Sequence, residues 1–169
     1  GRIEINNIMP DHLKPITAKL RESGVFVEEG DSYMVVDAKH KPHAVDIKTL
    51  PYPGFPTDLQ APYTSMMAVS DGTSMVIETI FENRFMHIPE LKRMGANVKV
   101  EGRTAVIEGT KKLTGAQVKA TDLRAGAALV IAGLCAEGKT EIDEIEHIKR
   151  GYCDFDKKLS SLGADITEA

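Results

Sequence analysis

An internal repeat constrains the fold of this 169-residue sequence more than any other feature. Each of two copies begins at a glycine, Gly72 or Gly138, and continues with a polar pair and the alternating apolar residues typical of a strand. An arginine, Arg84 or Arg150, stands at the same distance from each glycine, and a helical pattern follows it. The start of the chain has the same phase, with Gly1 in the position of the repeat glycine. Such self-similarity predicts a fold built from stacked supersecondary units.

The periodicity of apolar residues predicts the elements inside each unit. Strands are expected at 1–5, 25–29, 33–36, 98–101 and 104–108 and after Gly72, and helices at 11–21, 88–94 and 155–162. The strand pairs at 25–36 and 98–108 read as hairpins, with glycines at the tight turns. The helices at 88–94 and 155–162 are each followed by Gly-Ala, which is typical of a helix C-terminus.

A second marker, Thr-Asp-Leu, occurs at 57–59 and again at 121–123, and each copy precedes an apolar helix pattern. One unit is therefore helix, strand, helix, strand, strand, strand, and the chain holds about two and a half units. A single unit would leave one sheet face uncovered, so we expect the helices to pack inward against one another with the sheets outside. The predicted architecture is one α/β domain over residues 1–169, with a further strand expected at its end, after the 155–162 helix.

Composition excludes several classes of protein. The hydrophobic fraction of 42% and the charged fraction of 27% are typical of a soluble globular chain. A net charge of -4 without a basic run does not suggest binding to nucleic acid. The longest apolar stretch, 125–136, contains glycines and is shorter than the roughly 20 residues that cross a bilayer, and no leader pattern opens the chain. With two cysteines only, a reducing compartment is expected, which predicts a cytoplasmic protein.

The Thr-Asp pairs allow two interpretations. Thr57 and Thr121 occupy positions where helix N-caps belong, with Asp58 and Asp122 in the first turn, and Thr57 forms a capping-box pattern with the glutamine three residues later. In the second copy the box position is Arg124, so a cation and a carboxylate meet at a helix start. A helix N-terminus beside an arginine favours a bound phosphate or carboxylate.

Arg84 and Arg150 allow a similar choice between a solvated surface role and a binding role. They lie in loops at matching edges of two units, and loops at one edge of a repeat array usually carry its binding surface. Cys135 and Cys153 have no surrounding pattern that activates a nucleophile. The sequence shows no metal-ligand spacing, no phosphate loop and no dinucleotide fingerprint, so no metal or cofactor is predicted.

Five motifs together resemble the UDP-N-acetylglucosamine enolpyruvyl transferases, in the family's order and spacing. They are Phe55–Ala61, Glu78–His87, Leu91–Ala96, Gly115–Ala125 and His147–Tyr152. The resemblance runs nearly end to end and implies the inside-out α/β barrel fold, built from βαβαββ-type units. Family members have two domains of three units each. By this resemblance the chain is most of the domain that contains the C-terminus, and the other domain, which carries the family's catalytic-loop cysteine, lies outside it.

The resemblance also implies a reaction. Members of the family transfer enolpyruvate from phosphoenolpyruvate to the 3′-hydroxyl of UDP-N-acetylglucosamine and release phosphate, the first committed step of peptidoglycan synthesis. Asp58, with Thr57 beside it, matches the carboxylate at the sugar hydroxyl, the proposed base. Ile80 and Phe81 match contacts to the nucleotide-sugar. Arg84, Arg124 and Arg150 match the cations that bind phosphoenolpyruvate, and Asp122 matches a nearby acid that orients them.

Two alternatives remain open from the sequence. The shikimate-pathway enolpyruvyl transferase shares the fold and the chemistry, although residues 81–87 and 122–124 look like the nucleotide-sugar enzyme. A non-catalytic binding module that uses the repeat as a scaffold is the third possibility. Because half of the family's cleft would be missing, the chain alone is expected to have no turnover and to need the other domain as its partner.

Overall fold

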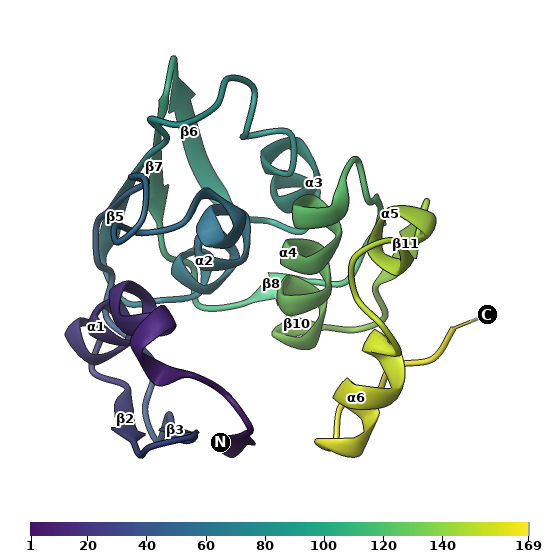
Figure 1. Ribbon diagram of the computed structural model, residues 1–169. Helices are drawn as coiled ribbons and strands as arrows, with labels where there is room; N and C mark the ends of the chain where they lie inside the picture. The colour runs from purple at the N-terminus through teal and green to yellow at the C-terminus, as the bar shows by residue number, and fades with distance from the viewer. Residues whose placement is uncertain (169) are drawn as a thin grey trace.

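Two helices, α2 (Gln60–Ala68) and α4 (Leu123–Leu134), form the centre of the computed structural model, which describes residues 1–168 (Figure 1). Most residues of both helices are buried, and the Ser65 hydroxyl donates a hydrogen bond of 2.7 Å to the Ala128 carbonyl of the facing helix. A hydroxyl that satisfies a buried carbonyl lets two apolar helices approach closely. The predicted arrangement, with helices inside and sheets outside, is confirmed.

Two larger sheets lie outside these helices. The first has the order β1-β3-β2 and is antiparallel, with β1 (Arg2–Asn6), β3 (Tyr33–Asp37) and β2 (Phe26–Glu29). The second has the order β4-β5-β7-β6, in which β4 is parallel to β5 and the other pairs are antiparallel. Its strands are β4 (Ile47–Lys48), β5 (Thr73–Ile77), β7 (Thr104–Glu108) and β6 (Asn97–Glu101). Both predicted hairpins are present.

Short parallel pairs and small helices connect the units. The parallel pairs are β8 (Leu113–Thr114) with β10 (Ala136–Glu137), and β9 (Gln117–Lys119) with β11 (Glu141–Asp143). Three short helices are α3 (Ile88–Arg93), α5 (Glu146–Lys149) and α6 (Phe155–Ser161), and two 3₁₀ turns are η1 (Pro10–Leu13) and η2 (Thr57–Leu59). The predicted helix ends are confirmed at Gly95 and Gly163, which have φ of 91° and 95° and so adopt the left-handed conformation that glycine tolerates best.

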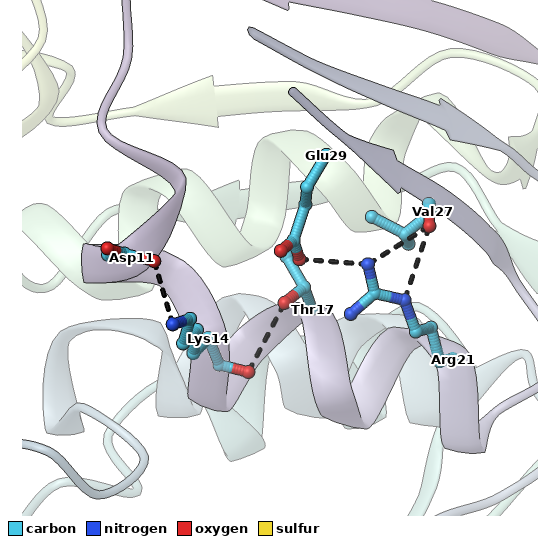
Figure 2. Close-up of polar contacts among 6 residues, drawn as sticks. All are labelled: Asp11, Lys14, Thr17, Arg21, Val27 and Glu29. Atoms are coloured by element: carbon cyan, nitrogen blue, oxygen red, sulfur yellow. Dashed lines mark hydrogen bonds and ion pairs between the residues drawn. The ribbon is translucent and has the colours of Figure 1, made fainter. Parts of the chain in front are cut away.

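The first unit is held together by polar contacts between α1 (Lys14–Glu22) and β2. Arg21 donates hydrogen bonds from Nε and Nη2 to the Val27 carbonyl, and its Nη2 also pairs with Glu29 at 2.9 Å (Figure 2). The buried Thr17 hydroxyl donates to the Lys14 carbonyl one turn earlier. The Arg21 bonds fix the helix against the hairpin beside a small apolar cluster that includes Val27 and Met34.

The main core joins the central helices to the four-stranded sheet. Its fully buried members include Met67 of α2 and Leu129 of α4. Leu91 of α3, Met94 at the C-cap of α3 and Ile107 of β7 pack with them. Burial of a side chain of this size contributes about 1.5–3 kcal/mol, so the cluster holds the loops at the ends of these elements in place.

Two sequence predictions about element boundaries were wrong. The helix expected at 11–21 is the turn η1 followed by α1, which starts at Lys14 with Pro15 in its first turn, because proline prefers that position. The strand expected after α6 does not form, since residues 164–168 have no strand beside them in the described part of the chain. No helix within residues 1–168 has the length and apolar character needed to span a membrane.

Candidate functional site

An ion pair between two distant repeats marks the candidate site. Arg124 Nε donates a hydrogen bond of 2.6 Å to Asp58 Oδ1, although the two residues are 66 positions apart in the sequence. The side chain of Asp58 is 67% exposed and that of Arg124 is 29% exposed. The packing of α2 against α4 brings the starts of both helices to this surface. The pair therefore presents a carboxylate and a guanidinium together at an open face.

Asp122 is the N-cap of α4. Its Oδ1 accepts hydrogen bonds from the backbone N–H groups of Arg124 at 2.7 Å and Ala125 at 2.8 Å. The prediction that Thr121 caps this helix and that Asp122 lies in its first turn was wrong by one residue. A carboxylate accepts charge-assisted bonds from backbone donors and also offsets the positive end of the helix, so it is the stronger cap. This cap orients the first turn, which carries Arg124.

Thr57 is not a cap either. Pro56 occupies the N-cap position of η2 and makes no side-chain cap bond, and the Thr57 hydroxyl instead donates to Glu78 Oε2 at 2.9 Å. The predicted capping box with Gln60 is absent from the described residues, because the Gln60 side chain bonds Thr64 within α2. Asp58 therefore keeps both of its oxygens free of the helix start, unlike Asp122.

Glu78 is a buried carboxylate directly after β5, only 1% exposed. Besides the Thr57 hydroxyl it accepts hydrogen bonds from the Thr49 hydroxyl at 2.8 Å and from the backbone N–H groups of Ile80 at 2.8 Å and Phe81 at 3.2 Å. The sequence patterns assigned no role to this residue. Strict in-and-out alternation along β5 is the signal that could have found it, since Ser74, Val76 and Glu78 all lie on the buried side.

The Arg84 guanidinium lies over the ring of Phe81. The Arg84 guanidinium carbon lies 4.3 Å from the centre of the Phe81 ring, which is a cation–π distance. Phe81 is 48% exposed, Ile80 is half-buried, and both follow the Glu78 carboxylate that holds their backbone. The predicted contact residues Ile80, Phe81 and Arg84 therefore lie on one short segment.

His87 connects this segment to the start of α4. Burial lowers the pKa of its imidazole to about 4, while the Asp122 carboxylate and a hydrogen bond to the Arg84 backbone act in the opposite direction. The side chain is 1% exposed, and its Nε2 atom has no hydrogen-bond partner in the described structure. A histidine with this pKa is neutral near pH 7, so it acts as a structural hydrogen-bonding group and not as a cation.

Arg150 ends α5 and is exposed, with no ion pair within residues 1–168. Its segment nonetheless borders the pair described above. Burial raises the pKa of Tyr152, and Asp58 raises it further whereas Arg124 lowers it, which places this phenol within electrostatic reach of both. Gly151 packs on Leu123 so tightly that a Cβ atom would lie 2.6 Å from the leucine Cδ1. The backbone next to Arg150 therefore packs against the first turn of α4.

Comparison with known proteins identifies the family. The family model for EPSP synthase (3-phosphoshikimate 1-carboxyvinyltransferase) matches residues 1–159. The chain belongs to the EPSP synthase family of enolpyruvyl transferases. Over 98% of its length it is 59% identical to UDP-N-acetylglucosamine 1-carboxyvinyltransferase 1 of Caldanaerobacter subterraneus subsp. tengcongensis, and 55% identical to UDP-N-acetylglucosamine 1-carboxyvinyltransferase 2 of Clostridium tetani. The chain spans about 40% of the length of each.

Solved structures support the same fold. The enolpyruvyl transferase NikO from Streptomyces tendae superposes with a TM-score of 0.89 at 28% identity, covering 98% of this chain and 40% of NikO. EPSP synthase from Acinetobacter baumannii superposes with a TM-score of 0.77 at 17% identity, covering all of this chain and 40% of the other, which supports the fold alone. The enolpyruvyl transferase fold that the resemblance implies is confirmed.

Proposed function

We propose that this chain is part of a UDP-N-acetylglucosamine 1-carboxyvinyltransferase, which moves enolpyruvate from phosphoenolpyruvate to the 3′-hydroxyl of UDP-N-acetylglucosamine. The observation that carries the proposal is the ion pair of Asp58 with Arg124 on an open face. Identity of 54–59% to curated transferases of that name over 98% of the chain supports it. In a cell this reaction belongs to peptidoglycan synthesis, and we place it in the cytoplasm.

Asp58 is the proposed base. The sugar hydroxyl oxygen adds to the enol carbon of phosphoenolpyruvate while Asp58 accepts the hydroxyl proton. The methylene carbon gains a proton from an acid outside this chain, and loss of a proton from the new methyl group with departure of phosphate then restores the double bond. A carboxylate that caps no helix and is 67% exposed is available for this work, since general bases must lie within hydrogen-bond reach of the proton they remove.

The guanidinium groups are the proposed anion-binding groups. Arg84, Arg124 and Arg150 hold the carboxylate and phosphate of phosphoenolpyruvate, and Asp122 orients Arg124 through the first turn of α4. Fixed cations stabilise a multiply charged anion most strongly when water is excluded, which requires a second wall over the open face. Thr57, Ile80 and Phe81 contribute contacts to the nucleotide-sugar.

A second domain is the proposed source of that wall. In this proposal residues 1–169 are one partial domain, and the remaining part of the enzyme supplies the other side of the cleft; the coverage of about 40% of its relatives supports this. The chain alone is therefore expected to bind substrate weakly and to form no product. A coupled phosphate-release assay on the 169-residue chain checks this, and product formation would contradict it.

Ligand binding separates this proposal from its nearest rival. In saturation-transfer NMR on the full-length enzyme we expect signal transfer to UDP-N-acetylglucosamine and none to shikimate 3-phosphate. Transfer to shikimate 3-phosphate alone would assign the chain to the shikimate-pathway reaction. Asp58→Asn and Arg124→Ala should strongly reduce turnover in the same protein, and full retention of turnover and binding in both would favour a non-catalytic scaffold.

A further inference from the structure

We propose that Glu78 is a positioning residue of the transferase: its buried carboxylate fastens the segment Ile80–Phe81 to the turn that carries Asp58. The inference rests on the proposed function and extends it to a residue that the sequence patterns left without a role. Three parts of the chain meet at this one side chain. They are the end of β4 at Thr49, the start of η2 at Thr57 and the backbone just after β5.

The chemistry at Glu78 is unusual for a buried acid. Its side chain is 1% exposed, yet none of the ion pairs within residues 1–168 includes it. Buried carboxylates are normally compensated by a cation, because removing the charge from water is unfavourable. Here four neutral donors perform that task, two hydroxyls and two backbone N–H groups. An arrangement of this kind persists only if the donors are held rigidly, and it holds them rigidly in turn.

The two carboxylate oxygens of Glu78 bond two different parts of the site. Oε1 accepts from Thr49, Ile80 and Phe81, so it sets the backbone of the segment expected to contact the nucleotide-sugar. Oε2 accepts from Thr57, the residue directly before the proposed base. The Thr49 hydroxyl also accepts from the Thr79 N–H at 2.8 Å, which extends the network along the same segment. A shift of Glu78 would therefore move both parts of the site together.

The third unit offers a natural comparison. Glu144 stands at the same distance after Gly138 as Glu78 does after Gly72. It is exposed, its φ is 63°, and its carboxylate lies 3.6 Å from Lys119 at the surface. The repeat therefore does not require a buried carboxylate at this position. The burial of Glu78 is specific to the unit that carries Ile80 and Phe81, and Glu144 supplies a matched control.

Steady-state kinetics of the full-length enzyme test the inference. In Glu78→Ala we expect the KM for UDP-N-acetylglucosamine to rise about tenfold and kcat to fall. The reason is that the Ile80–Phe81 backbone and the Thr57 hydroxyl both lose their hydrogen-bond acceptor. The KM for phosphoenolpyruvate should rise by a smaller factor, since Glu78 bonds no arginine within residues 1–168 and reaches Arg84 only through the Phe81 ring. Glu78→Gln keeps one oxygen for the three Oε1 donors and should recover most of the loss. Glu144→Ala should match the wild type.

Amide hydrogen exchange gives a readout independent of turnover and of the folding of the alanine variant. We expect the Ile80 and Phe81 amides to be protected in the wild type, slightly less in Glu78→Gln, and to exchange about tenfold faster or more in Glu78→Asp, whose shorter side chain cannot reach both groups. Glu144→Ala should leave them unchanged. Unchanged exchange in Glu78→Asp, or equal rises of both KM values in Glu78→Gln, would overturn the positioning role. Loss of protection in a protein without transferase activity would instead refute the proposed function and retain the positioning role.

Discussion

The tripeptides Thr57-Asp58-Leu59 and Thr121-Asp122-Leu123 are identical and occupy equivalent places in two repeats, but their side chains have different partners. In the second copy the aspartate caps α4 through two backbone N–H groups, and Thr121 is exposed. In the first copy a 3₁₀ turn precedes α2, the threonine bonds Glu78, and the aspartate faces solvent beside Arg124.

The difference shows how one motif can supply both a structural and a chemical carboxylate. An aspartate that accepts hydrogen bonds from helix N–H groups has its position fixed by them. The turn η2 moves Asp58 away from the start of α2, so its carboxylate caps no helix and pairs with Arg124 at an exposed position. Substitution of Asp58 should therefore lower activity with little change in stability, whereas substitution of Asp122 should lower stability.

Asp58→Asn should produce the largest effect. The amide keeps the shape of the side chain but cannot accept a proton, so kcat of the full-length transferase should fall by about 10²–10⁴-fold. Because the side chain is exposed, the free energy of unfolding should change by less than about 0.5 kcal/mol. Steady-state rates and urea denaturation measure both quantities. An unaffected kcat would remove Asp58 from the chemistry and erase the distinction between the copies.

His87, which lies between the two copies, should make stability depend on pH. Its pKa is about 4 in the folded protein against an ordinary value of 6.5 in the unfolded chain, so the unfolded chain binds the proton first as the pH falls. Stability should be full above pH 6.5 and decrease by about 3 kcal/mol as the pH falls to 4. His87→Gln should flatten this part of the pH profile, measured by urea denaturation. The exposed His40→Gln is the control, and equal slopes in all three proteins would show that His87 is not buried in its neutral form.

Asp122→Ala should reduce stability by about 1 kcal/mol, since two helix N–H groups lose their acceptor. Asp122→Asn keeps a capping oxygen and removes the charge, so it should retain most of that stability. Thermal unfolding of the two variants separates the contribution of the capping hydrogen bonds from that of the negative charge. If the alanine variant is as stable as the wild type, Asp122 is not an effective cap and the contrast with Asp58 weakens.

Thr121→Ala should have the smallest effect, within about 0.5 kcal/mol of the wild type, because the residue is exposed and caps nothing. The same measurement on Thr57→Ala should show a larger loss, since the Glu78 carboxylate would lose one of its donors. A reversed order of the two threonines would return the capping role to Thr121.

Much of this architecture could be predicted because its signals are local. Gly95 and Gly163 end helices where a left-handed residue is needed, and the hairpins 25–36 and 98–108 follow from strict alternation. The roles of the threonines could not, since Thr57 and Thr121 are both followed by Asp-Leu and, among the described residues, only Thr57 bonds an acceptor from another element, Glu78. The local sequence shows that a threonine can cap a helix, but it does not show whether another element places an acceptor near its hydroxyl.

The sequence by itself determined the repeat, the order of its elements and the inward packing of the helices, and it supplied the acids and arginines predicted for the site. Only the tertiary structure decided which aspartate caps a helix and which caps none, because Glu78, directly after β5 and 21 positions further along the chain, reaches Thr57. It also decided that Arg124 pairs with Asp58, a contact made by the packing of α4 on α2 across 66 positions. Periodicity records what each residue does along its own element, whereas a hydrogen bond between elements depends on their final distance.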